Sequence, residues 1–118
     1  MLKDKKVLHL SLYKEAFEVM ITGEKTEEYR EPSKWIKSRL LNKDGSHRDY
    51  DYVKFTNGYG KDKPYFIAKF LGCDQFKPKI GEFKTYSNGL EVSVLNKDYI
   101  IYLGKIYEKG NLKQQENG

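Results

Sequence analysis

Apolar and polar residues alternate along several short stretches of the chain, as they do in β-strands with one buried face. These stretches are rich in Tyr, Phe, Val and Ile, the residues that favour strands. They span residues 7–12, 50–56, 65–71, 90–95 and 99–107. Turn-forming residues such as Asn57-Gly58 and Ser87-Asn88-Gly89 separate them. The pattern therefore predicts a strand in each stretch.

Two early segments have helical spacing instead. Apolar residues recur at roughly helical intervals from Tyr13 to Thr22, with Ser11 as a candidate N-cap and Gly23 where a left-handed C-terminal residue belongs. A second helix is predicted after Pro32, from the apolar residues between positions 35 and 41. The expected fold is α+β: a small β-barrel with two N-terminal helices packed against it.

Length and composition limit the size and the content of the core. The chain has 118 residues, and we expect a single domain over residues 1–108 with a polar, disordered tail over residues 109–118. Ten Tyr and six Phe accompany one Trp, so the core should be rich in aromatic side chains. Trp35 is interpreted as a core anchor, and its basic neighbours leave a base-stacking role open.

The charge and the rare residue types exclude several classes of site. A net charge of +5 permits a polyanionic partner, although many ordinary solvated domains have the same balance. One cysteine, Cys73, and two histidines, His9 and His47, predict no disulfide, no metal site and no cofactor. Cys73 is expected to be inert and His9 to have no catalytic role. No stretch is apolar over the roughly 20 residues that span a membrane, so we expect a cytoplasmic protein.

Residues 23–30 concentrate the candidate chemistry. They read G-x-K-x-x-E-x-R and place Lys25, Glu28 and Arg30 in one short segment. If this segment is extended, Glu28 and Arg30 share a face, and Lys25 joins them only if the preceding turn rotates the chain. An ammonium, a carboxylate and a guanidinium in one place can hold a planar polar ligand or a phosphate. The structural alternative is a set of ion pairs that only fixes the mouth of the barrel.

The 23–30 segment resembles the characteristic motif of the ASCH family, whose domains are related in fold to PUA domains. The flanking strands and helix follow in the family's order, so the resemblance covers residues 7–106. It implies a PUA-like β-barrel and a ligand-binding cleft lined by Gly23, Lys25, Glu28 and Arg30. The stretch Asn57–Pro64 is explained mostly by a turn, with Tyr59 as the candidate stacking residue if it forms a ligand rim.

Two functional classes follow from this resemblance. The first is an RNA-binding module that captures RNA or a nucleoside-like ligand in the charged cleft. The alternative is an enzyme, either an amidohydrolase of acylated cytidine-type nucleosides or an RNA-processing enzyme, that acts through Lys25 and Glu28. Glu28 stands where the amidohydrolases have a catalytic threonine, and neither Glu82 nor Glu91 can be assigned as their second acid. We therefore expect RNA binding, with the choice of RNA over DNA and the oligomeric state left open.

Overall fold

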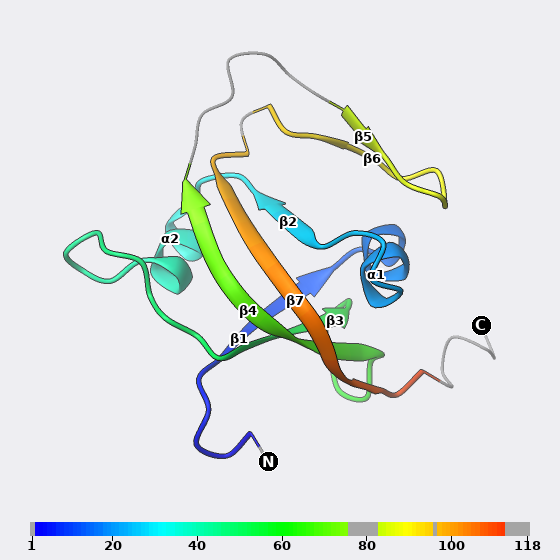
Figure 1. Ribbon diagram of the computed structural model, residues 1–118, viewed down its shortest axis with the longest axis horizontal. Coiled ribbons are helices and arrows are strands. Elements are labelled where there is room, and N and C mark those ends of the chain that lie inside the picture. Colours follow the sequence, from blue (N-terminus) through cyan, green and yellow to red (C-terminus); the bar gives the residue numbers. More distant parts are fainter. Residues whose placement is uncertain (1, 76–82, 96, 113–118) are drawn as a thin grey trace.

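A curled, barrel-like sheet of five strands forms the centre of the fold, and two helices pack against it (Figure 1). The computed structural model describes residues 2–75, 83–95 and 97–112. In chain order the elements are β1 Val7–Leu12, α1 Lys14–Ile21, β2 Glu27–Arg30, α2 Lys34–Leu40, β3 Tyr52–Asn57, β4 Tyr65–Gln75, β5 Phe83–Thr85, β6 Glu91–Ser93 and β7 Tyr99–Gly110. The α+β class and the small barrel-like sheet expected from the sequence are both present.

The strand order in the large sheet is β1-β3-β4-β7-β2, so β1 and β2 are its two edges. β1 runs parallel to β3, and the other neighbouring strands are antiparallel. The long pair β4 and β7 has register shifts near Ala68, Phe70 and Gly72. Such irregularities bend and twist a strand pair. The bent pair curls the sheet and brings its two edge strands toward each other.

The core fills the inside of the curled sheet. Alternate residues on β1, β3, β4 and β7 point inward, as the period-2 pattern requires. The buried residues of this core are Leu8, Leu10, Leu12, Phe17, Met20, Ile36, Leu40, Val53, Phe55, Phe66, Ala68, Cys73, Tyr99, Ile101 and Leu103. The ring of Phe66 lies 5.2 Å from that of Phe55 and 5.5 Å from that of Phe17, between centroids. Phenylalanine therefore joins the sheet to α1, and the core contains the aromatic side chains that the composition led us to expect.

Several predicted element ends need correction. Ser11 does not cap the first helix: Tyr13 is the N-cap and makes no side-chain cap hydrogen bond. The second helix begins after Ser33, whose hydroxyl accepts a hydrogen bond from the Ile36 amide. β4 continues through Gly72 to Gln75, because the bulges absorb the glycine where we expected the strand to end. β7 continues to Gly110, three residues beyond its predicted end, and pairs with the start of β4.

The short hairpin of β5 and β6 was only partly anticipated. The sequence predicted a strand at residues 90–95 but none at Phe83–Thr85, and the two pair antiparallel. The hairpin lies beside β2 in Figure 1. Val94 packs there with Tyr29 and Ile100 in a second, smaller hydrophobic cluster. The outer side of β2 is therefore covered as well as its inner side.

The single cysteine is buried in the core. Burial, together with the nearby Asp74 carboxylate, raises the pKa of Cys73 to about 11, which keeps the thiol protonated at neutral pH. The described residues contain no group of three or more His, Cys, Asp or Glu side chains placed to hold a metal ion. Within these residues, neither helix has the length and apolar character needed to cross a membrane. Residues 113–118 of the predicted tail lie outside the described part of the chain.

Candidate functional site

The turn after α1 positions the charged segment. Gly23 has a φ of +87°, a left-handed conformation that glycine adopts without strain. The Lys25 amide then donates to the Val19 carbonyl at 3.0 Å, which holds the chain against the helix end. From there the chain enters β2, where Glu28 pairs with Ile101 and Arg30 with Tyr99 of β7. The sequence therefore delivers these side chains on an edge strand of the sheet.

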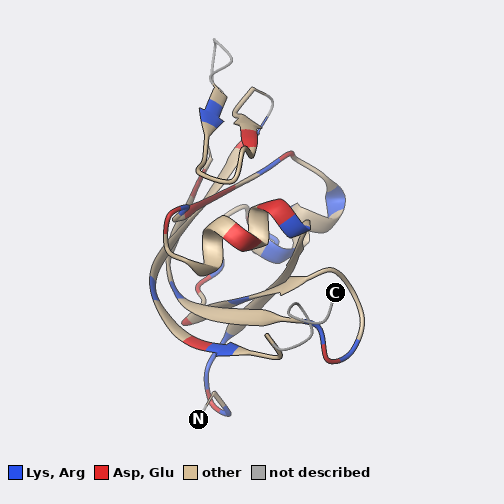
Figure 2. Cartoon of the chain, turned by 90° about the vertical axis from the view of Figure 1, so that its right-hand side faces the viewer, with Lys and Arg blue, Asp and Glu red and all other residues tan. Residues whose placement is uncertain are grey.

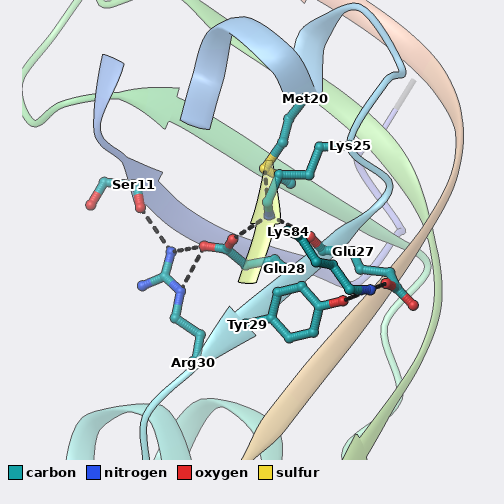
Figure 3. Close-up of polar contacts among 8 residues, drawn as sticks. All are labelled: Ser11, Met20, Lys25, Glu27, Glu28, Tyr29, Arg30 and Lys84. Carbon is teal, nitrogen blue, oxygen red and sulfur yellow. Dashed lines mark hydrogen bonds and ion pairs between the residues drawn. The ribbon is translucent and has the colours of Figure 1, made fainter. Parts of the chain in front are cut away.

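Residues on β2 alternate between two environments. Glu28 and Arg30 point to one side of the strand, whereas Glu27 and Tyr29 point to the other (Figure 3). This confirms the expectation that an extended segment places Glu28 and Arg30 on one face. Lys25 precedes the strand, and its long side chain reaches the same face.

Glu28 connects two cations. One carboxylate oxygen, Oε1, lies 3.1 Å from Lys25 Nζ, and the other, Oε2, lies 2.9 Å from both Nε and Nη2 of Arg30. Lys25 is only 2% exposed and Glu28 only 7%. Buried charges are stable only when they are paired and hydrogen-bonded. The pairs foreseen by the structural alternative are thus both present, and two cations share one anion.

Further hydrogen bonds complete the surroundings of Lys25. Its ammonium also donates to the Glu27 carbonyl and lies 3.7 Å from the Met20 sulfur (Figure 3). Three groups therefore surround the nitrogen within the protein. An ammonium held in this way is a fixed positive charge in the wall of the sheet, behind Arg30.

Arg30 links the two edges of the curled sheet. Its Nη2 donates at 2.9 Å to the backbone carbonyl of Ser11 on β1, in addition to its contact with Glu28. Ser11 and Arg30 lie on opposite edge strands, so this bond spans the gap between β1 and β2. Among the described residues, no acceptor is found for Nη1, the remaining guanidinium nitrogen. Arg30 therefore keeps donor capacity for a ligand.

A cleft of about 480 Å³ opens beside this link. Its walls come from β1, β2, α2, β3 and the loop that follows β3. The lining residues are His9, Leu10, Ser11, Arg30, Trp35, Lys54, Thr56 and Tyr59. Of the residues expected to bind ligand, Arg30 and Tyr59 line the cleft. Gly23, Lys25 and Glu28 do not; the first shapes the turn, and the other two lie behind Arg30.

Two aromatic side chains stand in the cleft with much of their surface free. Trp35 is 47% exposed and Tyr59 is 86% exposed. The expectation that Trp35 anchors the core is therefore wrong: on α2, Ile36 and Leu40 take the buried positions. The guanidinium carbon of Arg39 lies 5.1 Å from the centre of the Trp35 ring system, which is a cation–π distance. An exposed Trp35 that could stack on a base was the less favoured of the two interpretations of the sequence.

The cleft is electrostatically positive. Arg30 and Lys54 line it, and no Asp or Glu is among the described lining residues. Elsewhere Lys and Arg are interspersed with Asp and Glu along the chain (Figure 2), so this separation is local. Burial, and then the charge of Lys54, lowers the pKa of His9 below 6.5. His9 is therefore mostly neutral at pH 7, and the lysine and the arginine supply the charge.

A second polar cluster lies on the other side of β2. The Tyr29 hydroxyl donates at 2.5 Å to Glu27 and accepts at 2.6 Å from Lys84 of β5 (Figure 3). Burial and the Glu27 hydrogen bond raise the pKa of Tyr29 to about 12. The hydrogen bond with Tyr29 also raises the pKa of Lys84. This cluster fastens the β5–β6 hairpin to β2, a role for Glu27 and Lys84 that the sequence did not reveal.

The residues considered for hydrolysis are not assembled in the cleft. Lys25 and Glu28 are buried, Thr26 is exposed next to them, and Glu91 is an exposed residue of β6. Glu82 lies outside the described residues. Lys25 and Glu28 are therefore surrounded by groups of the protein, as in a structural ion pair. A catalytic role for either residue stays a prediction.

Comparison with protein-family models, with curated proteins and with solved structures finds no match for this chain. Membership of the ASCH family accordingly stays a prediction that depends on the 23–30 segment.

The buried ion pairs predict a large effect of neutralising Glu28. Glu28→Gln leaves Lys25 without its carboxylate in a buried position, so we expect the free energy of unfolding to fall by about 3 kcal/mol. Urea unfolding followed by circular dichroism measures this change. Glu31→Gln is the matched control, because Glu31 is exposed and, among the described residues, pairs with Lys97 alone at 3.3 Å. Equal effects of the two substitutions would contradict a buried, paired Glu28.

The surroundings of His9 predict its titration. The midpoint for its ring protons, followed by NMR, should lie below pH 6.5, because burial and the Lys54 charge both disfavour the protonated ring. Lys54→Met should raise the midpoint without restoring it fully, since burial is the larger cause. A wild-type midpoint above 6.5 would show that the ring is not held in this positive surrounding.

Proposed function

We propose that the cleft binds single-stranded RNA. The observation that carries this proposal is the convergence of two cations, Arg30 and Lys54, and two exposed aromatics, Trp35 and Tyr59, on one cleft. The lining residues that the structure describes include no carboxylate. Sites for single-stranded nucleic acid combine these same elements: cationic groups for the phosphates and aromatic faces for the bases.

Arg30 is the phosphate contact in this proposal. Its Nε and Nη2 are held by Glu28 and by the Ser11 carbonyl, so the guanidinium has a fixed orientation before ligand arrives. Less conformational entropy is lost on binding when a side chain is already ordered. Lys25 and Glu28 then act as positioning residues. Their net charge is zero, so the positive charge of Arg30 remains available to an anion.

Trp35 and Tyr59 are the base contacts. A base can stack on either ring only when it is unpaired, because a duplex buries the faces of its bases in its own stack. Trp35 has Arg39 on its ring, and an exposed surface remains for a ligand. Stacking tolerates any base, so we expect weak sequence preference.

The resemblance to ASCH domains supports the same class of ligand. The roles that we propose for the individual residues differ from those that the resemblance implied. Arg30 and Tyr59 keep the expected ligand contacts. Glu28 orients Arg30 and is itself paired with Lys25, without contact to the ligand. Gly23 forms the turn that precedes them. The amidohydrolase and ribonuclease alternatives have no specific observation in their favour, since the Lys25 ammonium is surrounded by protein groups.

The stacking contacts give the first test of this proposal. Trp35→Ala and Tyr59→Ala should each raise the Kd for single-stranded RNA by about fivefold or more, the effect of losing one base–aromatic stack. Fluorescence anisotropy with a labelled oligouridylate measures the Kd. Tyr13→Ala is a matched control for Tyr59, because Tyr13 is 88% exposed and does not line the cleft.

The phosphate contacts are tested by salt. Lys54→Met should reduce the slope of log K against log salt concentration by about 0.7, the value for one phosphate contact on a single strand. The same titration with single-stranded DNA shows whether the 2′-hydroxyl contributes. Binding that is unchanged by the Trp35, Tyr59 and Lys54 substitutions together would place the RNA elsewhere and overturn the proposal.

A further inference from the structure

The outer face of the sheet continues from the cleft across neighbouring strands. His9 and Lys54, which line the cleft, are cross-strand partners on β1 and β3. On the far side of β3, Lys54 pairs with Ile67 and Tyr52 pairs with Lys69 of β4. Cross-strand partners point to the same face of a sheet. Tyr52, Lys54 and Lys69 therefore share one outer face, and Lys54 belongs to both this face and the cleft.

Tyrosine rings and lysines alternate on this face. The Nζ of Lys54 lies 4.4 Å from the centre of the Tyr65 ring, and the ring centroids of Tyr52 and Tyr107 are 5.1 Å apart. Tyr107, on the neighbouring strand β7, is 48% exposed. Lys69 is exposed beside Tyr52. The face thus repeats the two chemical features of the cleft, cations and aromatic surface, outside it.

The fold fixes the position of one of these rings, that of Tyr65. Gly110 of β7 pairs with Tyr65. A Cβ at position 110 would lie 2.3 Å from the Tyr65 ring, so only glycine at this position leaves room for the ring. The Tyr65 hydroxyl donates to the Glu108 carboxylate. Asp51, at the edge of the face, accepts from the Lys6 amide. Neither of these donors carries a charge, so the attraction of this face for a phosphate comes from Lys54 and Lys69.

We propose that a bound single strand leaves the cleft past Lys54 and continues across this outer face, with Lys69 contacting a phosphate and Tyr107 stacking on a base. This inference rests on the proposed function, and it extends the site from the cleft to four strands. From β1 to β7 the face spans three inter-strand spacings, about 15 Å. A dinucleotide fills the cleft alone in this arrangement, whereas a longer strand covers both regions.

The test compares strand lengths on the full chain. Competition against a labelled probe gives the Kd of a uridine dinucleotide and of an oligouridylate of about eight nucleotides, a length typical for one small binding domain. We expect Tyr107→Ala to weaken the longer strand by about fivefold or more and to leave the dinucleotide unchanged. Lys69→Ala should lower the salt slope for the longer strand by about 0.7 and leave the dinucleotide slope unchanged.

Controls separate this face from the rest of the surface. Lys43→Ala and Tyr13→Ala remove an exposed lysine and an exposed tyrosine that lie neither in the cleft nor on this face. Neither should change the Kd for either ligand. Tyr107 packs against Tyr52, so thermal unfolding is measured alongside; Lys69 has an exposed side chain and tests the proposal even if Tyr107→Ala does not fold.

The outcomes distinguish the two proposals. If the longer strand binds wild type and both variants equally, with the dinucleotide still sensitive to Trp35→Ala, the cleft binds RNA and the extension is wrong. If the Trp35, Tyr59 and Lys54 substitutions all leave dinucleotide binding unchanged, or wild type binds no RNA at any length, the proposed function itself fails. A length-dependent loss confined to the Tyr107 and Lys69 variants confirms the extension.

Discussion

The buried carboxylate of Glu28 is the constraint on which the site depends. It lies at the edge of a sheet where its solvation by water is largely lost, so it must be neutralised by groups of the protein itself. Lys25 satisfies one oxygen and Arg30 the other. Because Arg30 also donates to the Ser11 carbonyl, the same arrangement connects β2 to β1. Charge pairing and closure of the curled sheet are therefore parts of one structure.

This arrangement explains how a guanidinium of fixed orientation comes to lie at the open side of a barrel-like sheet. Arg30 is held from behind by Glu28, while Trp35 and Tyr59 approach from α2 and from the loop after β3. The position of α2 does not depend on a ligand, because the helix buries Ile36 and Leu40 in the core. The cleft thus presents a positive charge that is held in place by hydrogen bonds, together with exposed aromatic surface.

The sequence predicts most of the elements because their apolar patterns are strong. The G-x-K-x-x-E-x-R segment also predicts the shared face of Glu28 and Arg30, since alternation in an extended chain is a local property. Whether Lys25 and Glu28 face ligand or protein depends on what packs over them, namely Met20 and the Glu27 carbonyl. Trp35 was misplaced for the same reason: helical spacing does not tell which flank of a short helix meets the core. The roles of Lys54 and Lys84 depend on pairing between distant strands, which the local pattern does not contain.

Trp35, the only tryptophan of the chain, lines the cleft and can report directly on a ligand bound there. Its fluorescence, excited selectively over tyrosine, is followed while unlabelled single-stranded RNA is added. Stacking of a base on the exposed indole should quench the emission in a saturable manner, with the same Kd as anisotropy and with weaker affinity at high salt. Binding seen by anisotropy without any change in the Trp35 emission would contradict the account, because the RNA would then lie away from the cleft.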